Sequence, residues 1–96
     1  MAFNLKFLPT AENNIEEATD YYANISSRVF NHFNESLDQT LLRIELNPFF
    51  QKKYGNVRSL RVKNFPYIIF YEVDENEEII YVLSVFCTHQ NPEKYP

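Results

Sequence analysis

The sequence predicts an α+β domain in which two helices form a hairpin that packs on a mostly antiparallel, four-stranded sheet, in the order β-α-α-β-β-β. Three observations predict this class. First, apolar residues recur at helical spacing in two adjacent stretches of the first half. Second, near residue 57 the spacing of apolar residues changes to every second residue, as in a strand. Third, two strongly apolar stretches follow. The 96 residues, of which 45% are hydrophobic, suit one domain spanning residues 1–96.

The chain opens with a predicted short strand and a first helix. Phe3, Leu5 and Phe7 alternate with polar residues, as in a strand, and Pro9 ends that pattern. Thr10 is then placed to cap a helix. Spacings of three and four residues define one apolar face of this helix, which carries Ala11, Ile15, Ala18, Tyr22 and Ile25.

A second helix is predicted directly after the first. Ser26 and Ser27 interrupt the apolar pattern and can cap a new helix, and Asn47 followed by Pro48 stops it. Because the connection is short, the two helices should be antiparallel neighbours. The apolar face of the second helix carries Phe30, Phe33, Leu37, Leu41 and Ile44.

Residues 57–63 predict a strand with one apolar and one basic face. Arg61 and Lys63 lie two residues apart on the basic face, so their Cβ atoms should be about 6.5–7 Å apart. This spacing is close to that of neighbouring phosphates on a nucleic-acid strand, and it also suits two carboxylates of a protein partner. The simpler alternative is a charged sheet face that is open to water.

Two central strands complete the predicted sheet. Residues 66–73 and 79–86 are apolar on both faces apart from Glu72, which is typical of strands in the middle of a sheet. The polar residues 74–78 form the turn between them. Residues 49–56, which contain the only glycine, are expected to form a loop before this antiparallel meander.

Charge is distributed unevenly along the chain. The formal net charge is −4, yet residues 51–65 contain five basic side chains and no acidic one. Residues 1–50 contain seven acidic and three basic side chains, and residues 72–78 contain five acidic ones. An acidic protein is poorly suited to non-specific nucleic-acid binding, whereas a local basic segment can hold a phosphate or an acidic partner. The same charges also suit solvated loops and edges.

The sequence predicts no membrane segment, cofactor or disulfide. The longest apolar stretch, residues 79–87, is too short to cross a bilayer, and "MAFNLKFLPTAENN" does not read as a signal peptide. A single glycine cannot build a glycine-rich phosphate loop, and a single cysteine cannot form an internal disulfide. We therefore expect a cytoplasmic protein that uses no cofactor.

Cys87 and His89, in "SVFCTHQNP", raise the question of a catalytic thiol or a metal site. With His32 they are too few for a closed zinc site, which needs about four ligands, so we predict no metal. If the last strand continues to His89, both side chains lie on an apolar face that suits a packed thiol better than a nucleophile. His89 can act as an acid or base, or it can be an ordinary surface histidine. The expected face carries Ile79, Tyr81, Leu83 and Val85.

Several segments are shared with a known family. "TAENNIEEATDYYANIS" and "FNESLDQTLLRIELNP" cover the helices, "NP…Y..VR" and "FPYIIFY" cover the strands, and "VF.T.QNPEKY" ends the chain. In this order, the chain resembles the RelE/ParE superfamily of toxins from bacterial type II toxin–antitoxin modules, often described as plasmid stabilisation proteins. The resemblance covers nearly the whole chain and implies a RelE/ParE-like fold, with a helical hairpin on a mostly antiparallel sheet.

The resemblance implies a growth-inhibiting toxin that a cognate antitoxin neutralises in a toxin–antitoxin hetero-oligomer. ParE-like members inhibit DNA gyrase by binding, and RelE-like members cut mRNA on the ribosome. A metal-independent ribonuclease needs a base, an acid, and cations that stabilise the charged phosphorane. A third alternative is a degenerate, non-toxic member that still binds an antitoxin.

The resemblance also suggests functional residues. In a nuclease, Arg61 and Lys63 would steady phosphates, and His89 or Tyr95 would serve as the acid or base. Relatives usually have histidine at the position of Cys87 and tryptophan at that of Tyr95. These departures and the net charge of −4 favour inhibition by binding over RNA cleavage. The residues expected to contact the target are Arg58, Arg61, Lys63 and Tyr71.

Overall fold

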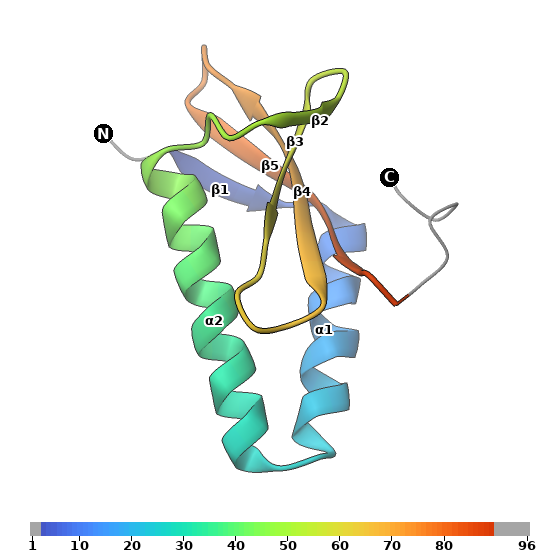
Figure 1. Cartoon of the computed structure of the whole chain (residues 1–96). Helices are drawn as coiled ribbons and strands as arrows, with labels where there is room; N and C mark the ends of the chain where they lie inside the picture. The colour runs from blue at the N-terminus through green and yellow to red at the C-terminus, as the bar shows by residue number, and fades with distance from the viewer. Residues whose placement is uncertain (1–2, 90–96) are drawn as a thin grey trace.

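The structure, a computed structural model, describes residues 3–89 and confirms the predicted α+β class (Figure 1). Within these residues, neither helix is long and apolar enough to span a bilayer. The elements in chain order are β1 (Asn4–Phe7), α1 (Pro9–Ala23), α2 (Ser27–Leu46), β2 (Lys52–Tyr54), β3 (Val57–Arg61), β4 (Tyr67–Asp74) and β5 (Ile79–Cys87).

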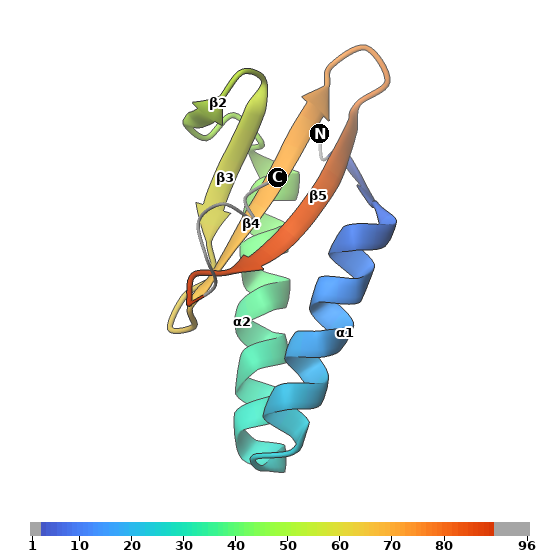
Figure 2. The ribbon, with the colours of Figure 1, turned by 90° about the vertical axis from the view of Figure 1, so that its right-hand side faces the viewer.

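The two helices form a hairpin on one face of the sheet, and the turn that joins them extends past the sheet (Figures 1 and 2). We call this covered side the helix face and the other side the open face. The strand order is β1-β5-β4-β3-β2. The last three strands form the predicted antiparallel meander, and β1 pairs in parallel with β5.

Within residues 3–89 the sheet has five strands, one more than the sequence predicts. Lys52–Tyr54, expected within a loop, pairs with β3 as an antiparallel edge strand. Gly55 adopts a φ of 50°, which favours glycine and allows a tight turn through Gly55 and Asn56. All three residues of β2 are exposed, so no buried alternation marks the strand in the sequence.

The ends of the helices differ slightly from the prediction. α1 begins at Pro9, whose fixed φ suits a first helical position, so Thr10 lies inside the helix and Leu8 takes the cap position. Ser26 caps α2 as predicted, and its hydroxyl accepts a backbone N–H of the first turn at 3.1 Å. α1 ends before Ile25, which is exposed in the turn rather than buried on the apolar face.

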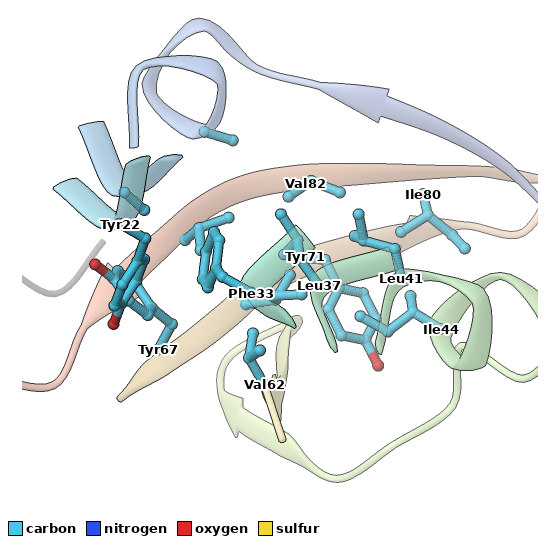
Figure 3. Close-up of a cluster of buried hydrophobic side chains, with 14 residues drawn as sticks. Tyr22, Phe33, Leu37, Leu41, Ile44, Val62, Tyr67, Tyr71, Ile80 and Val82 are labelled. Atoms are coloured by element: carbon cyan, nitrogen blue, oxygen red, sulfur yellow. The ribbon is translucent and has the colours of Figure 1, made fainter. Parts of the chain in front are cut away.

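The main core lies between the helical hairpin and the helix face (Figure 3). Phe33 of α2 is at its centre, with its ring centroid 4.9 Å from Tyr22, 5.2 Å from Phe65 and 5.4 Å from Tyr67. The buried face predicted for α2 is confirmed for four of its members, while Phe30 is half-buried. Those four are Phe33, Leu37, Leu41 and Ile44.

A bulge in β5 reverses which side chains face the helices. The pairing of β4 with β5 shifts between Phe70 and Tyr71, which leaves Leu83 as the extra residue of β5. Beyond the bulge, Val85 and Cys87 pack in the main core, whereas Leu83 packs with side chains of the open face. The single apolar face predicted for this strand is therefore wrong. The prediction wrongly placed Ile79, Tyr81 and Leu83 on the same face as Val85 and Cys87.

Candidate functional site

The predicted basic pair, Arg61 and Lys63, does not lie on one face of a strand. Arg61 is the last residue of β3, where it pairs with Ile68 and is exposed on the open face. Lys63 is also exposed, but it lies in the turn that follows the strand. The alternation continues one residue past the end of β3, since Val62 is buried in the main core, but Lys63 already lies in the turn.

Arg58 holds the loop that follows α2. Its guanidinium donates a hydrogen bond to the carbonyl of Phe50 at 2.7 Å, and its Cζ lies 5.3 Å from the ring centre of Phe49. Arg58 and Arg61 are three residues apart in β3, so their side chains point to opposite faces of the sheet. Arg58 therefore lies on the helix face. Its guanidinium is thus engaged within the protein rather than presented beside Arg61.

Tyr71 is fully buried in the main core (Figure 3). Its hydroxyl donates a hydrogen bond to the carbonyl of Pro48 at 2.9 Å. Burial raises the pKa of this hydroxyl above its ordinary value. The side chain ties the end of α2 to the centre of the sheet. Contact with a target, as predicted for Tyr71, does not fit this interior position.

Replacing Tyr71 by phenylalanine should lower the free energy of unfolding by about 1–3 kcal/mol, because the buried Pro48 carbonyl loses its donor. Urea denaturation followed by circular dichroism measures the loss. Tyr21→Phe, at an exposed tyrosine, is the matched control and should change stability little. Equal stability of the Tyr71→Phe and control variants would contradict a structural role for this hydrogen bond.

The candidate residues near the C-terminus lie at the end of β5. Cys87 is half-buried and pairs with Tyr67 of β4, and His89 is exposed just beyond the strand. Tyr95 lies outside the described residues. Between residues 3 and 89, no three His, Cys, Asp or Glu side chains are grouped so that they could hold a metal ion.

Cys87 and His89 both line an open groove of about 610 Å³ that the sequence did not predict. The groove lies between the C-terminal half of α1, the turn from β3 to β4, and the end of β5. Its volume is within the range of ligand and peptide-anchor sites. In the sequence, the adjacent Tyr21 and Tyr22 could have indicated this groove, because Tyr22 faces the core and Tyr21 is exposed at the groove.

Two tyrosines in this groove are held in their protonated form. The ring centroids of Tyr22 and Tyr67 lie 6.3 Å apart at one end of the core (Figure 3). Burial, and then the neighbouring Tyr22 and Cys87, raise the pKa of Tyr67 well above its ordinary value. Burial also raises the pKa of Tyr22, partly offset by its hydrogen bond with Tyr67. At neutral pH both hydroxyls are therefore hydrogen-bonding groups and not general bases.

This burial predicts a loss of stability at alkaline pH. The pKa of Tyr67 in the folded protein lies above the unfolded value of about 10, so the unfolded state loses its proton first. The contribution of Tyr67 is thus fully present below pH ~10 and is lost as the pH rises further. Melting temperatures between pH ~8 and ~11 should fall less steeply in Tyr67→Phe than in the wild type. Tyr54→Phe, at an exposed site, should follow the wild type, and parallel curves for all three proteins would refute the prediction.

The open face of the sheet carries a second, smaller apolar cluster. Val57, Phe70 and Phe86 are buried there, and the half-buried Ile68 and Leu83 pack against them. The ring of the edge-strand residue Tyr54 lies 6.5 Å from that of Phe70. Arg61 and Glu72 are exposed ionisable residues on this same face. Arg61 thus pairs with Ile68, a residue that packs against this buried apolar cluster.

A known family accounts for this arrangement. The family model described as "ParE toxin of type II toxin-antitoxin system, parDE" matches residues 5–92. The chain belongs to the ParE toxin family. It is therefore a toxin of the type II toxin–antitoxin class within the RelE/ParE superfamily, as the sequence motifs implied. No curated protein sequence matches this ParE-family toxin significantly.

Solved structures share the fold of this ParE-family toxin. A chain of the chromosomal ParDE system from P. aeruginosa is 16% identical, with a TM-score of 0.71 over 88% of this chain and 94% of that one. A chain of the RelBE2 toxin–antitoxin complex from Mycobacterium tuberculosis is 13% identical, with a TM-score of 0.62 over 88% and 96%. A mutant of the E. coli toxin RelE in the free state is 19% identical, with a TM-score of 0.58 over 88% and 82%. At these identities, the likeness establishes the fold.

Proposed function

We propose that this ParE-family toxin inhibits growth by binding DNA gyrase, and that a cognate antitoxin neutralises it in a hetero-oligomer. The observation that carries the proposal is the match of residues 5–92 to the ParE toxin family. The similar folds of the P. aeruginosa ParDE and M. tuberculosis RelBE2 structures support an antitoxin as the partner.

The placement of the candidate residues supports inhibition by binding. An RNA-cleaving site needs an acid, a base and cations around one phosphate. Arg61 points to the open face, whereas His89 lines the groove beside α1 on the helix side. Arg58 and Tyr71 are engaged within the protein by the loop after α2. A protein inhibitor needs a complementary surface rather than a convergent set of catalytic groups.

Ribosome-dependent mRNA cleavage is the second candidate function. One observation favours it: the N–H of Thr88 donates to the carbonyl of Pro66 at 2.8 Å. This bond ties the end of β5, which carries His89, to the turn that carries Lys63. A histidine and a cation held on neighbouring segments are two of the groups that such a nuclease uses.

One induction experiment separates these functions. The toxin is expressed alone, and with the protein encoded by the small reading frame beside its gene. Growth arrest relieved by the neighbour supports a toxin–antitoxin module, whereas harmless expression leaves only a non-toxic, antitoxin-binding member. Loss of DNA supercoiling and DNA breaks, without new mRNA 5′ ends, support gyrase inhibition. Codon-linked mRNA cuts would instead establish the nuclease.

A further inference from the structure

The side of α2 that faces away from the core carries two exposed leucines. Leu42 is 52% exposed and Leu46 is 64% exposed, and their spacing of four residues places them next to each other on one side of the helix. Phe49, which is 47% exposed, follows just beyond the end of α2. Large apolar side chains that are exposed in one place are typical of a surface that packs against another protein.

Opposite charges flank these leucines on the two sides of the helix. Asp38 lies four residues before Leu42, and Arg43 directly follows it, and both charged residues are exposed. Side chains of one helix pair when they are three or four residues apart, and α2 offers neither Asp38 nor Arg43 an opposite charge at these spacings. The Cζ of Arg43 lies 5.5 Å from the ring centre of Phe50, which holds the guanidinium near the end of α2.

The spacing of these residues fits a second helix that runs parallel to α2. Gln39, Leu42 and Leu46 follow the steps of three and four residues that form the seam between two parallel helices. Asp38 and Arg43 then occupy the two flanks of the seam, where a side chain faces the residue five places further along on the other helix. Asp38 of one chain thus meets Arg43 of the other, and twofold symmetry makes this contact twice. An antiparallel pair would instead match each flank with the same flank of its copy.

We infer that the outer side of α2 is a homodimer interface, in which the two leucines pack against their own copies and Asp38 of each chain pairs with Arg43 of the other. The inference goes beyond the proposed function and does not depend on it. The open face, which carries Arg61, lies on the other side of the sheet from the helices (Figure 2). Both copies therefore keep this face free in the dimer.

The contact is confined to the C-terminal half of α2. Toward the start of the helix the same side becomes polar and carries the exposed Glu35, so the two helical hairpins diverge there. Such a contact is smaller than the roughly 800 Å² that each partner buries in a standard stable interface. The dimer is therefore weak, and dilute solutions of the toxin contain the monomer.

The test measures self-association of the full-length toxin by sedimentation equilibrium, from about 10 µM to about 1 mM protein in about 50 mM NaCl. Leu42→Ser/Leu46→Ser should weaken the dimer at least about tenfold, because it removes the apolar contact. Asp38→Arg, which sets two arginines against each other, should weaken it about three- to tenfold. Asp38→Arg/Arg43→Asp restores opposite charges and should return the dissociation constant to within about twofold of the wild type.

Matched controls lie elsewhere on the same protein. Tyr21 and Ile25 are 60% and 55% exposed, so Tyr21→Ser/Ile25→Ser removes equally exposed apolar side chains from α1 and the turn that follows it. Glu75→Arg makes the same charge change as Asp38→Arg in the turn between β4 and β5. Both controls should keep the wild-type self-association within about twofold, and circular dichroism verifies the folding of every variant.

Cross-linking tests the parallel arrangement separately. In a Cys87→Ser background, Gln39→Cys places a single thiol on the seam, where a parallel pair brings it opposite its own copy and within reach of a disulfide. Asn13→Cys, at an exposed site on α1, is the control. With oxidised glutathione as the oxidant, the covalent dimer of Gln39→Cys should form at least about tenfold faster than that of the control.

The outcomes separate the interface from its geometry. A toxin that stays monomeric at every concentration would overturn the inference, and so would self-association that Leu42→Ser/Leu46→Ser leaves unchanged. If the charge-exchanged double variant stayed as weak as Asp38→Arg, or if Gln39→Cys cross-linked no faster than its control, the parallel pairing of Asp38 with Arg43 would be wrong. Growth arrest and its relief by the neighbouring protein are measured independently, so these results leave the proposed function untouched.

Discussion

Replacing Phe33 by alanine is expected to lower the free energy of unfolding by about 3–5 kcal/mol. The ring is fully buried and packs within 5.4 Å, between ring centroids, of Tyr22, Phe65 and Tyr67. Its removal leaves a cavity between α2 and β4 that these rigid aromatic neighbours cannot readily fill. Domains of this size are stable by only about 5–15 kcal/mol, so the variant should be marginally folded.

Urea denaturation and thermal melting both measure this effect. In a domain of this size, each kcal/mol of lost stability corresponds to about 4–8 °C in melting temperature. Leu42→Ala on the exposed side of the same helix is the control, and it should change stability by less than about 1 kcal/mol. If Phe33→Ala lost no more stability than this control, Phe33 would not be the centre of the core.

Replacing Arg61 by alanine is expected to relieve the growth arrest caused by the toxin. Arg61 is exposed at the end of β3, beside the apolar cluster of the open face. Arginine is enriched among interface hot spots, and the loss of a hot-spot residue typically costs at least ~2 kcal/mol, or about 30-fold in affinity for the target. Growth after induction and the affinity of the purified toxin for gyrase give two independent readouts.

Two further variants make the Arg61 result interpretable. Arg28→Ala, at an exposed arginine in the first turn of α2, makes the same substitution away from the open face and should remain toxic. Arg61→Lys keeps the charge but loses the planar fork of the guanidinium, so toxicity between wild type and Arg61→Ala is expected. A folded Arg61→Ala variant with full toxicity would remove the end of β3 from the target-binding surface.

Much of the fold could be predicted because an element that buries one face has a regular spacing of apolar residues in its sequence. The spacing in α2 identified Phe33 and Ile44 as core residues, and both are fully buried. β2 escaped prediction because an exposed edge strand of three residues has no apolar alternation. Its existence depends on the turn at Gly55 and on backbone bonding to β3, which composition does not reveal.

The candidate site was harder to predict, because basic and aromatic residues serve structural and functional purposes alike. Arg58 and Tyr71 belong to strands whose positions were predicted well, yet both are engaged by the loop that follows α2. Apolar periodicity does not reveal these partners, which are the carbonyl of Phe50 for Arg58 and the carbonyl of Pro48 for Tyr71. Lys63 left the predicted strand face because β3 ends at Arg61 and the chain turns toward β4.

The sequence by itself determined the class of the fold, the helical hairpin, the central strands and the toxin family, since periodicity and motif order are properties of the chain. Only the tertiary structure decided what surrounds Cys87 and His89. The bulge near Leu83 turns Cys87 toward the helices, and Asn14 of α1 closes the neighbouring strand edge through Val85. Strand register and helix docking set these surroundings, and both depend on contacts between segments far apart in the sequence.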